Sequence, residues 1–269
     1  MTSMFLVGAV IWRTPRPRDK VRSPVVRQGS RAPRTVRHGV PCGMTLPLLT
    51  DRFPDALNLA HAWHATQRRK GGEVPYISHL LGVASVALEF GADEDEAIAA
   101  LLHDALEDGP EYTGRNASDL RLEIVRRFGE RVAQLVDGAT DDAPDAGQAK
   151  APWQDRKAAY LRHLRAADTS MLLVSASDKL HNARTILTEV LTHPESQRAA
   201  FFERFSQGQA GTVQYYRLLA DAFMAAPAGQ ARPGLRALFR ELERTVSAIE
   251  HACGLTADEA RTGGPLQAE

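Results

Sequence analysis

The chain has 269 residues, enough for one large domain or two small ones, and 43% of them are hydrophobic, which is sufficient for a buried core. Its two cysteines, Cys42 and Cys253, are too few for a disulfide framework or a thiolate metal site, and no stretch approaches the roughly 20 apolar residues that span a bilayer. We therefore expect a cytoplasmic protein without a membrane segment.

The net charge of zero hides an asymmetry between residues 1–43 and the rest of the chain. The first 43 residues hold nine Lys or Arg against Asp19 alone, a net charge of +8, so the remaining body carries −8. An acidic body is repelled by the phosphate backbone, and we predict no stable nucleic-acid partner for it.

Residues 1–43 are rich in Arg, Pro and Ser and lack hydrophobic periodicity, which predicts a disordered basic extension. The apolar run from Met4 to Trp12 precedes the basic residues, whereas a secretory signal carries its positive charge first, so we expect no secretory signal. A basic nucleic-acid arm, a targeting peptide and a start codon set too early are the alternatives. We favour the last, with Met44 opening the domain.

Helical periodicity begins at Asp51. The first helix is expected to end in the basic cluster Arg68-Arg69-Lys70, with Gly71-Gly72 as its stop signal. After a loop, a second helix is expected to begin at His79 and to end before Gly91.

The third helix has a clear start signal. Asp93 is a favourable N-cap, and Glu96 is placed for the reciprocal hydrogen bond of a capping box. This helix is expected to close at Gly109-Pro110. Further helices are expected at about 117–128, 130–138, 153–167, 170–192, 196–205, 211–225 and 235–252.

Two loops and a tail complete the body. An acidic loop is expected over 140–152, a Pro-, Gly- and Ala-containing linker over 226–234, and a loose tail after 252. The body is therefore predicted to be all-α. We assign 44–225 to one domain and 226–269 to the linker, a C-terminal helix and the tail.

The stretch Leu101–Asp108 gathers four polar side chains inside an apolar run. Helical spacing places His103 beside Glu107 and Asp104 beside Asp108. Because carboxylates are costly to bury unless they are paired or bind a cation, a metal site is the first hypothesis. The structural alternative is a hydrogen-bonded pair in the core.

Residues elsewhere complete a possible ligand set. His79, His103, Asp104 and Asp178 supply two imidazoles and two carboxylates, which suit Mn, Fe, Co, Ni or Zn at one centre. Asn182 follows Asp178 by four residues and is expected on the same wall of its helix.

Acidic and basic residues near these positions suggest roles in catalysis. Glu107 and Asp108 are placed to orient and deprotonate a water. Arg69 and Lys70 precede His79 by a short loop and suit an anionic substrate, although the basic cluster could equally be the charge cap of a helix C-terminus.

Three other histidines are assigned away from metal binding. His61 and His64 fit a helix flank, in a structural or nucleotide-side role rather than a second metal site. His181 lies about 100° from Asn182 around the helix and is not expected to be a ligand.

Several motifs, in order, carry a family resemblance. They are Arg-Arg-Lys, Pro-Tyr-Ile-Ser-His, His-Asp-Ala-Leu-Glu-Asp, Thr-Asp-Asp and Ser-Asp-Lys-Leu-His-Asn-Ala-Arg. Over about residues 51–225 the chain resembles the HD-superfamily hydrolases. Within them it looks most like the ppGpp hydrolase branch, which comprises the SpoT/Rel hydrolase domain and the small stand-alone alarmone hydrolases.

The resemblance implies an HD-domain helical bundle and an enzyme that removes pyrophosphate from the 3′ position of ppGpp, leaving GDP. The implied partner is a small-molecule nucleotide, and the implied cofactor is Mn or another divalent metal. The implied roles are as follows: His79, His103, Asp104 and Asp178 bind the metal; Glu107 and Asp108 are the catalytic acidic pair; Arg69, Lys70 and Asn182 contact the nucleotide.

Departures from the common pattern spare every implied ligand. Gly72 to Val74 lengthen the loop before His79, and Leu80 replaces a common Pro. Gly109 stands where a Thr is usual, and Ser177 replaces an Ala. These changes are expected to leave hydrolysis intact. They do not decide whether the base of the substrate is guanine or adenine.

Two alternatives remain beside this hypothesis. One is an HD phosphohydrolase of nucleoside tri- or monophosphates, and the other is a non-catalytic HD module that senses nucleotides. Degenerate modules lose ligands, whereas this chain keeps the full set, which favours an enzyme.

Overall fold

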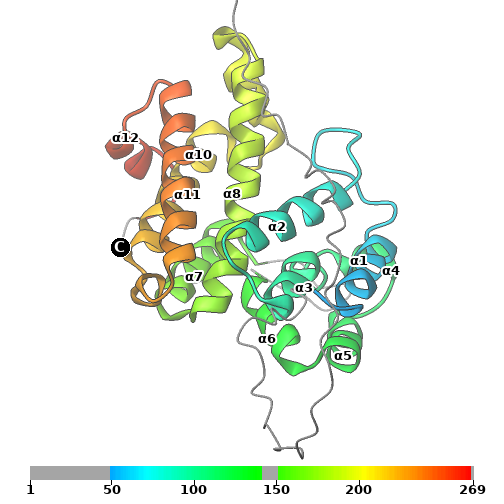
Figure 1. Cartoon of the computed structure of the whole chain (residues 1–269). Coiled ribbons are helices and arrows are strands. Elements are labelled where there is room, and N and C mark those ends of the chain that lie inside the picture. Colours follow the sequence, from blue (N-terminus) through cyan, green and yellow to red (C-terminus); the bar gives the residue numbers. More distant parts are fainter. Residues whose placement is uncertain (1–48, 141–150, 268–269) are drawn as a thin grey trace, which may run out of the picture. The chain divides into compact units, whose positions relative to one another are not determined.

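The structure is a computed structural model that describes residues 49–140 and 151–267 (Figure 1). These residues form helices and one isolated antiparallel bridge between Arg68 and Pro75, so the predicted all-α class is confirmed. The predicted extension over 1–43 and most of the predicted loop over 140–152 lie outside the described residues. Within the described ranges, no helix is both long and apolar enough to cross a membrane.

The α-helices are α1 (Arg52–Trp63), α2 (Ile77–Glu89), α3 (Glu94–Leu102), α4 (Gly109–Thr113), α5 (Ala117–Phe128), α6 (Glu130–Ala139), α7 (Trp153–Ala166), α8 (Thr169–Thr192), α9 (Arg198–Phe201), α10 (Gly208–Ala225), α11 (Pro233–Ala252) and α12 (Ala257–Thr262). Three short 3-10 helices accompany them: η1 (Glu195–Gln197), η2 (Phe202–Arg204) and η3 (Pro227–Gln230). The helix predicted over 196–205 is therefore divided among η1, α9 and η2.

Helix α8 joins two parts of the hydrophobic core. One part contains buried side chains of α7, α8, α10 and α11, and the other contains those of α1, α2, α3, α5 and α6. Leu172 and Leu173 of α8 lie in the first part, and Val174 lies in the second. Truncation of a fully buried Leu to Ala costs about 2–5 kcal/mol. Packing on both sides of α8 therefore fixes its position.

Helix α11 runs along α8 and is part of the same compact unit, residues 45–269 (Figure 1). Its apolar face supplies Leu235, Leu238 and Leu242 to the core that α8 shares. The segment after residue 225 is thus integrated with the helix that carries Asp178.

Side-chain caps define where α8 and α3 begin. The Asp168 carboxylate accepts hydrogen bonds from the backbone N–H groups of Ser170 and Met171, both 2.9 Å long. The predicted capping box of α3 is confirmed: Asp93 accepts from the Glu96 backbone at 3.0 Å, and Glu96 accepts from the Asp93 backbone at 2.8 Å. These caps satisfy donors that would otherwise lack partners at the start of each helix.

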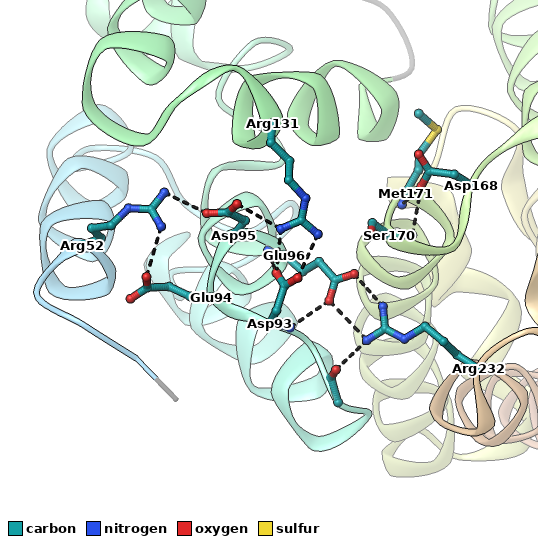
Figure 2. Close-up of polar contacts among 11 residues, drawn as sticks. Arg52, Asp93, Glu94, Asp95, Glu96, Arg131, Asp168, Ser170, Met171 and Arg232 are labelled. Atoms are coloured by element: carbon teal, nitrogen blue, oxygen red, sulfur yellow. Dashed lines mark hydrogen bonds and ion pairs between the residues drawn. The ribbon is translucent and has the colours of Figure 1, made fainter. Parts of the chain in front are cut away.

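Glu96 has a second partner from far along the chain (Figure 2). Its side chain is 1% exposed, and Arg232 Nη1 approaches its Oε1 to 2.6 Å. Arg232 also donates to the carbonyl of Gly91. The residue before α11 therefore holds the turn that leads into α3.

The first helix ends at Trp63 rather than in the basic cluster, so that prediction is wrong. The chain turns back on itself: the N–H of Tyr76 donates to the Gln67 carbonyl at 3.0 Å, and the N–H of Arg69 donates to the Val74 carbonyl at 2.8 Å. The basic cluster thus lies in a loop, and its interpretation as a helix C-terminal charge cap is also wrong.

The third helix ends at Leu102, short of the predicted Gly109-Pro110. Nδ1 of His103 lies 2.9 Å from the Ala100 carbonyl, and turns replace helix from His103 to Asp108. Gly109 and Pro110 begin α4 instead of ending α3. Proline is favourable there because an N–H in the first turn of a helix has no intrahelical acceptor, so its absence in proline costs no hydrogen bond.

The tail was predicted to be loose, which is wrong for residues up to 267. Thr256 and Glu259 form a capping box that starts α12. Leu266 is buried, and its N–H and carbonyl both bind the side-chain amide of Gln214 at 2.7 Å.

Candidate metal centre and substrate site

The four predicted ligands come from three parts of the chain and meet at one place. His79 lies in the first turn of α2, His103 and Asp104 directly follow α3, and Asp178 lies in α8. Ligand atoms of His79, His103 and Asp104 all lie within 4.8 Å of one another. Oδ1 of Asp178 lies 3.2 Å from Nε2 of His79 and 3.5 Å from Nε2 of His103.

His103 indicates that this donor set fits a cation. Its Nδ1 is occupied by the Ala100 carbonyl, which can only accept, so Nδ1 carries a proton. Its Nε2 is buried without a hydrogen bond of acceptable geometry, although Asp104 Oδ2 lies 2.9 Å away. Buried nitrogens are ordinarily hydrogen-bonded, and a metal ligand is the exception that this arrangement suits.

The electrostatics of the centre also favour positive charge. Burial alone would lower the pKa of His103, but Asp104 and Asp178 outweigh it and hold that pKa well above its usual range. Burial alone would raise the pKa of Asp178, but the charge of Lys179 and the two imidazoles hold it well below. Burial would likewise raise the pKa of Asp104, but His103 above all holds it well below its usual range. Two carboxylates that favour the ionised form beside two imidazoles are a setting that suits a cation.

Other side chains orient the carboxylates. The Tyr76 hydroxyl donates to Asp104 Oδ2 at 2.5 Å. Asn182 Nδ2 donates to Asp178 Oδ1 at 2.6 Å, and Lys179 Nζ donates to Asp178 Oδ2 at 2.7 Å. Asn182 thus lies on the predicted wall. Tyr76 was not assigned to the site from the sequence. Its position three residues before His79 was the signal that could have found it.

Glu107 and Asp108 are adjacent in sequence but line different cavities. Glu107 lines a cavity of about 320 Å³, where its Oε1 lies 3.9 Å from Nη1 of Arg156. Asp108 lines a cavity of about 800 Å³ and accepts a 2.8 Å hydrogen bond from Nε2 of Gln67. Turns replace the predicted helix here, but the Asp108 N–H still donates to the Asp104 carbonyl at 2.9 Å.

The two cavities adjoin because they share wall residues: Lys70, Asn182, Phe205 and Tyr216. Cationic side chains line both. Arg156, Lys157 and Lys179 line the smaller cavity, and Arg68, Arg69 and Arg204 line the larger one. Of the predicted substrate contacts, Arg69 Nη2 donates to Asn182 Oδ1 at 2.7 Å, and Lys70 Nζ lies 5.9 Å from the centroid of the Phe205 ring.

The three histidines that the sequence analysis considered beside the ligand set lie in different places. His61 is exposed on α1. His64 is buried, stacks on Tyr76 with 5.3 Å between ring centroids, and pairs through Nδ1 with Gln67. His181, which was not expected to be a ligand, lies against His79.

Comparison with known proteins gives a family match. A family model described as an HD domain matches residues 56–203. The chain is 38% identical over 143 residues to a guanosine-3′,5′-bis(diphosphate) 3′-pyrophosphohydrolase of Aquifex aeolicus, covering 52% of this chain and 18% of that one. It is 39% identical over 132 residues to a GTP pyrophosphokinase of Streptomyces coelicolor, covering 49% and 14%. The match thus spans less than a fifth of these two relatives.

A shorter relative and a solved structure extend the comparison. The chain is 36% identical over 135 residues to the guanosine-3′,5′-bis(diphosphate) 3′-pyrophosphohydrolase MESH1 of Xenopus tropicalis, covering 49% of this chain and 68% of that one. A metazoan ortholog of SpoT that hydrolyzes ppGpp has a similar fold, with a TM-score of 0.52 and 24% identity over 74% of this chain and 97% of that one.

Proposed function

The chain belongs to the HD domain family and is an HD phosphohydrolase related to ppGpp hydrolases, and from this premise we propose that it removes pyrophosphate from the 3′ position of ppGpp-type alarmone nucleotides. The observation that carries the proposal is the convergence of two imidazoles and two carboxylates beside two adjoining, cation-lined cavities.

In this proposal His79, His103, Asp104 and Asp178 hold a divalent cation, Mn²⁺ in the first instance. When bound, the cation supplies Lewis acidity that polarises a phosphoryl group and makes water more acidic. Tyr76 and Asn182 keep one carboxylate oxygen each in a fixed direction, which limits the reorganisation that binding requires.

Glu107 and Asp108 take the proton-transfer roles. The Gln67 amide donates to Oδ2 of Asp108 and orients this carboxylate, which in this proposal accepts a proton from water. Glu107 stands in the smaller cavity near Arg156, where its carboxyl group can pass a proton to the departing 3′ oxygen of the ribose while the water oxygen joins the released pyrophosphate. The two carboxylates thus act from separate sides of the substrate.

Substrate binding rests on cations in an otherwise acidic body. A nucleotide with two diphosphates carries high negative charge, and the guanidinium and ammonium groups around Lys70 offset it locally. Arg69 and Asn182, joined by their 2.7 Å hydrogen bond, offer donors and acceptors for a base in the larger cavity. Guanine and adenine are both allowed by this chemistry.

The test is product analysis with purified protein and Mn²⁺. We expect ppGpp to give GDP and pyrophosphate, and a parallel reaction with the adenine counterpart measures base preference. Pyrophosphate release from nucleoside triphosphates, with ppGpp intact, would contradict the alarmone assignment. Nucleotide binding without turnover of any substrate would indicate a sensing module instead.

A further inference from the structure

His181 lies behind His79, on the side away from the other ligands. The Nδ1 atoms of the two rings are 2.9 Å apart, and the ring centroids are 4.9 Å apart with 53° between the planes. The opposite nitrogen of His79, Nε2, faces Asp178 at 3.2 Å. Each nitrogen of His79 therefore has its own partner on its own side of the ring.

The chemistry of imidazole assigns the direction of this contact. A neutral imidazole has one N–H and one lone pair. If Nε2 of His79 gives its lone pair to a cation, Nδ1 must carry the hydrogen and donate it. Nδ1 of His181 is then the acceptor, in the place that a carboxylate, carbonyl or water takes behind many metal-binding histidines.

The fold makes room for this partner. Gly82 lies one turn after His79 on α2, and an added Cβ there would overlap the Nε2 and Cδ2 atoms of the His181 ring. On α8, His181 lies one turn after Asp178. Helices α2 and α8 therefore supply two of the proposed ligands, His79 and Asp178, and also His181, which supports His79.

We infer that His181 is a positioning residue of the metal centre, which accepts a hydrogen bond from His79 and holds that ring with Nε2 toward the carboxylates, and that Gly82 provides the space for it. This inference rests on the metal centre proposed above. His181 also lines the larger cavity. The test therefore measures metal affinity without nucleotide, which a contact with substrate alone would not change.

The experiment measures Mn²⁺ binding to the full, metal-free chain by titration calorimetry. His181→Leu removes the acceptor, whereas His181→Asn keeps an oxygen near the position of Nδ1. We expect the Leu variant to bind Mn²⁺ about ten- to a hundredfold more weakly. The Asn variant should recover most of that loss. His61→Leu, which removes an exposed histidine of α1, is the matched control and should bind like the wild type.

A second experiment tests the space that Gly82 leaves for the His181 ring, rather than the hydrogen-bond acceptor itself. Gly82→Ala should displace the His181 ring and weaken Mn²⁺ binding in the same direction as His181→Leu. Because asparagine is shorter, adding Gly82→Ala to His181→Asn should cost less affinity than adding it to the wild type. This route also serves if His181→Leu does not fold.

The outcomes separate this inference from the proposal beneath it. Wild-type affinity in both His181→Leu and Gly82→Ala would overturn the positioning role, as would equal losses in the Leu and Asn variants. Failure of the wild type to bind Mn²⁺ would instead remove the proposed metal centre, and this inference with it.

Discussion

The hydroxyl of Tyr76 donates a 2.5 Å hydrogen bond to Oδ2 of Asp104, the same oxygen that lies 2.9 Å from Nε2 of His103. The Tyr76 ring is held in turn by stacking on His64 and by edge contact with His79. A residue outside the predicted ligand set therefore controls the direction of one proposed ligand.

Tyr76→Phe should weaken Mn²⁺ binding while keeping the ring in place. Loss of a hydrogen bond to a metal ligand typically costs about tenfold or more in affinity. Titration calorimetry measures the change, and Tyr112→Phe, at an exposed tyrosine, is the control. Unchanged affinity would mean that Asp104 needs no support from the phenol.

Asp104→Ala should abolish both bound metal and hydrolysis. The substitution removes one of two carboxylates and leaves the buried Nε2 of His103 without its nearest oxygen. Elemental analysis of the purified variant measures the metal, and the ppGpp assay measures turnover. Undiminished turnover would refute the assignment of the centre.

Glu107→Gln and Asp108→Asn should each lower kcat and keep the metal. General acid–base groups contribute about 10²- to 10⁴-fold to rate, and neither carboxylate is a proposed ligand. Steady-state kinetics with Mn²⁺ and elemental analysis together test this. Loss of metal from either variant would make that residue a ligand rather than a proton carrier.

Arg232→Ala should destabilise the fold more than Arg131→Ala. The first leaves the buried carboxylate of Glu96 without its cationic partner. Breaking such a buried ion pair costs about 3 kcal/mol. The second removes the half-exposed partner of Asp93 and Asp95, and surface pairs of this kind are worth about 1 kcal/mol or less each. Urea unfolding gives both values, and equal losses would contradict the burial argument.

Glu250→Gln should change how stability depends on pH. Burial raises the pKa of Glu250 above its ordinary value of 4.5, despite nearby Arg217. A raised pKa stabilises the fold while the group is protonated, and this contribution is lost as pH rises through the folded-state pKa. The variant should therefore lose less stability than the wild type as pH rises above about 4.5.

Glu259→Gln provides the control of opposite sign for that experiment. Two hydrogen bonds lower the pKa of Glu259. The larger effect comes from the backbone N–H of Thr256 and the smaller one from its side-chain hydroxyl. A lowered pKa contributes stability that is present at higher pH and is lost as pH falls through the folded-state value. Thermal melts from about pH 2.5 to about pH 8 on both variants and the wild type give the two difference curves. Curves of the same sign would contradict this account.

Much of the local structure was readable from the sequence. The capping box of Asp93 and Glu96 is an interaction between residues three apart, so its pattern is visible without the fold. Helices α5 to α8, α10 and α11 follow the same logic of periodicity and breakers. The two wrong helix ends, near Trp63 and Leu102, arise where His64 and His103 bind neighbours and the chain leaves the helix.

By itself, the sequence determined the all-α class and predicted a candidate ligand set, because periodicity and residue chemistry are local properties. The candidates are His79, His103, Asp104 and Asp178. Tertiary structure alone decided which cavity Glu107 and Asp108 each enter, and that His181 lies behind His79. Those relationships depend on how α2 and the turns after α3 pack against α8. Such packing is set by contacts between residues far apart in the chain, which no local pattern encodes.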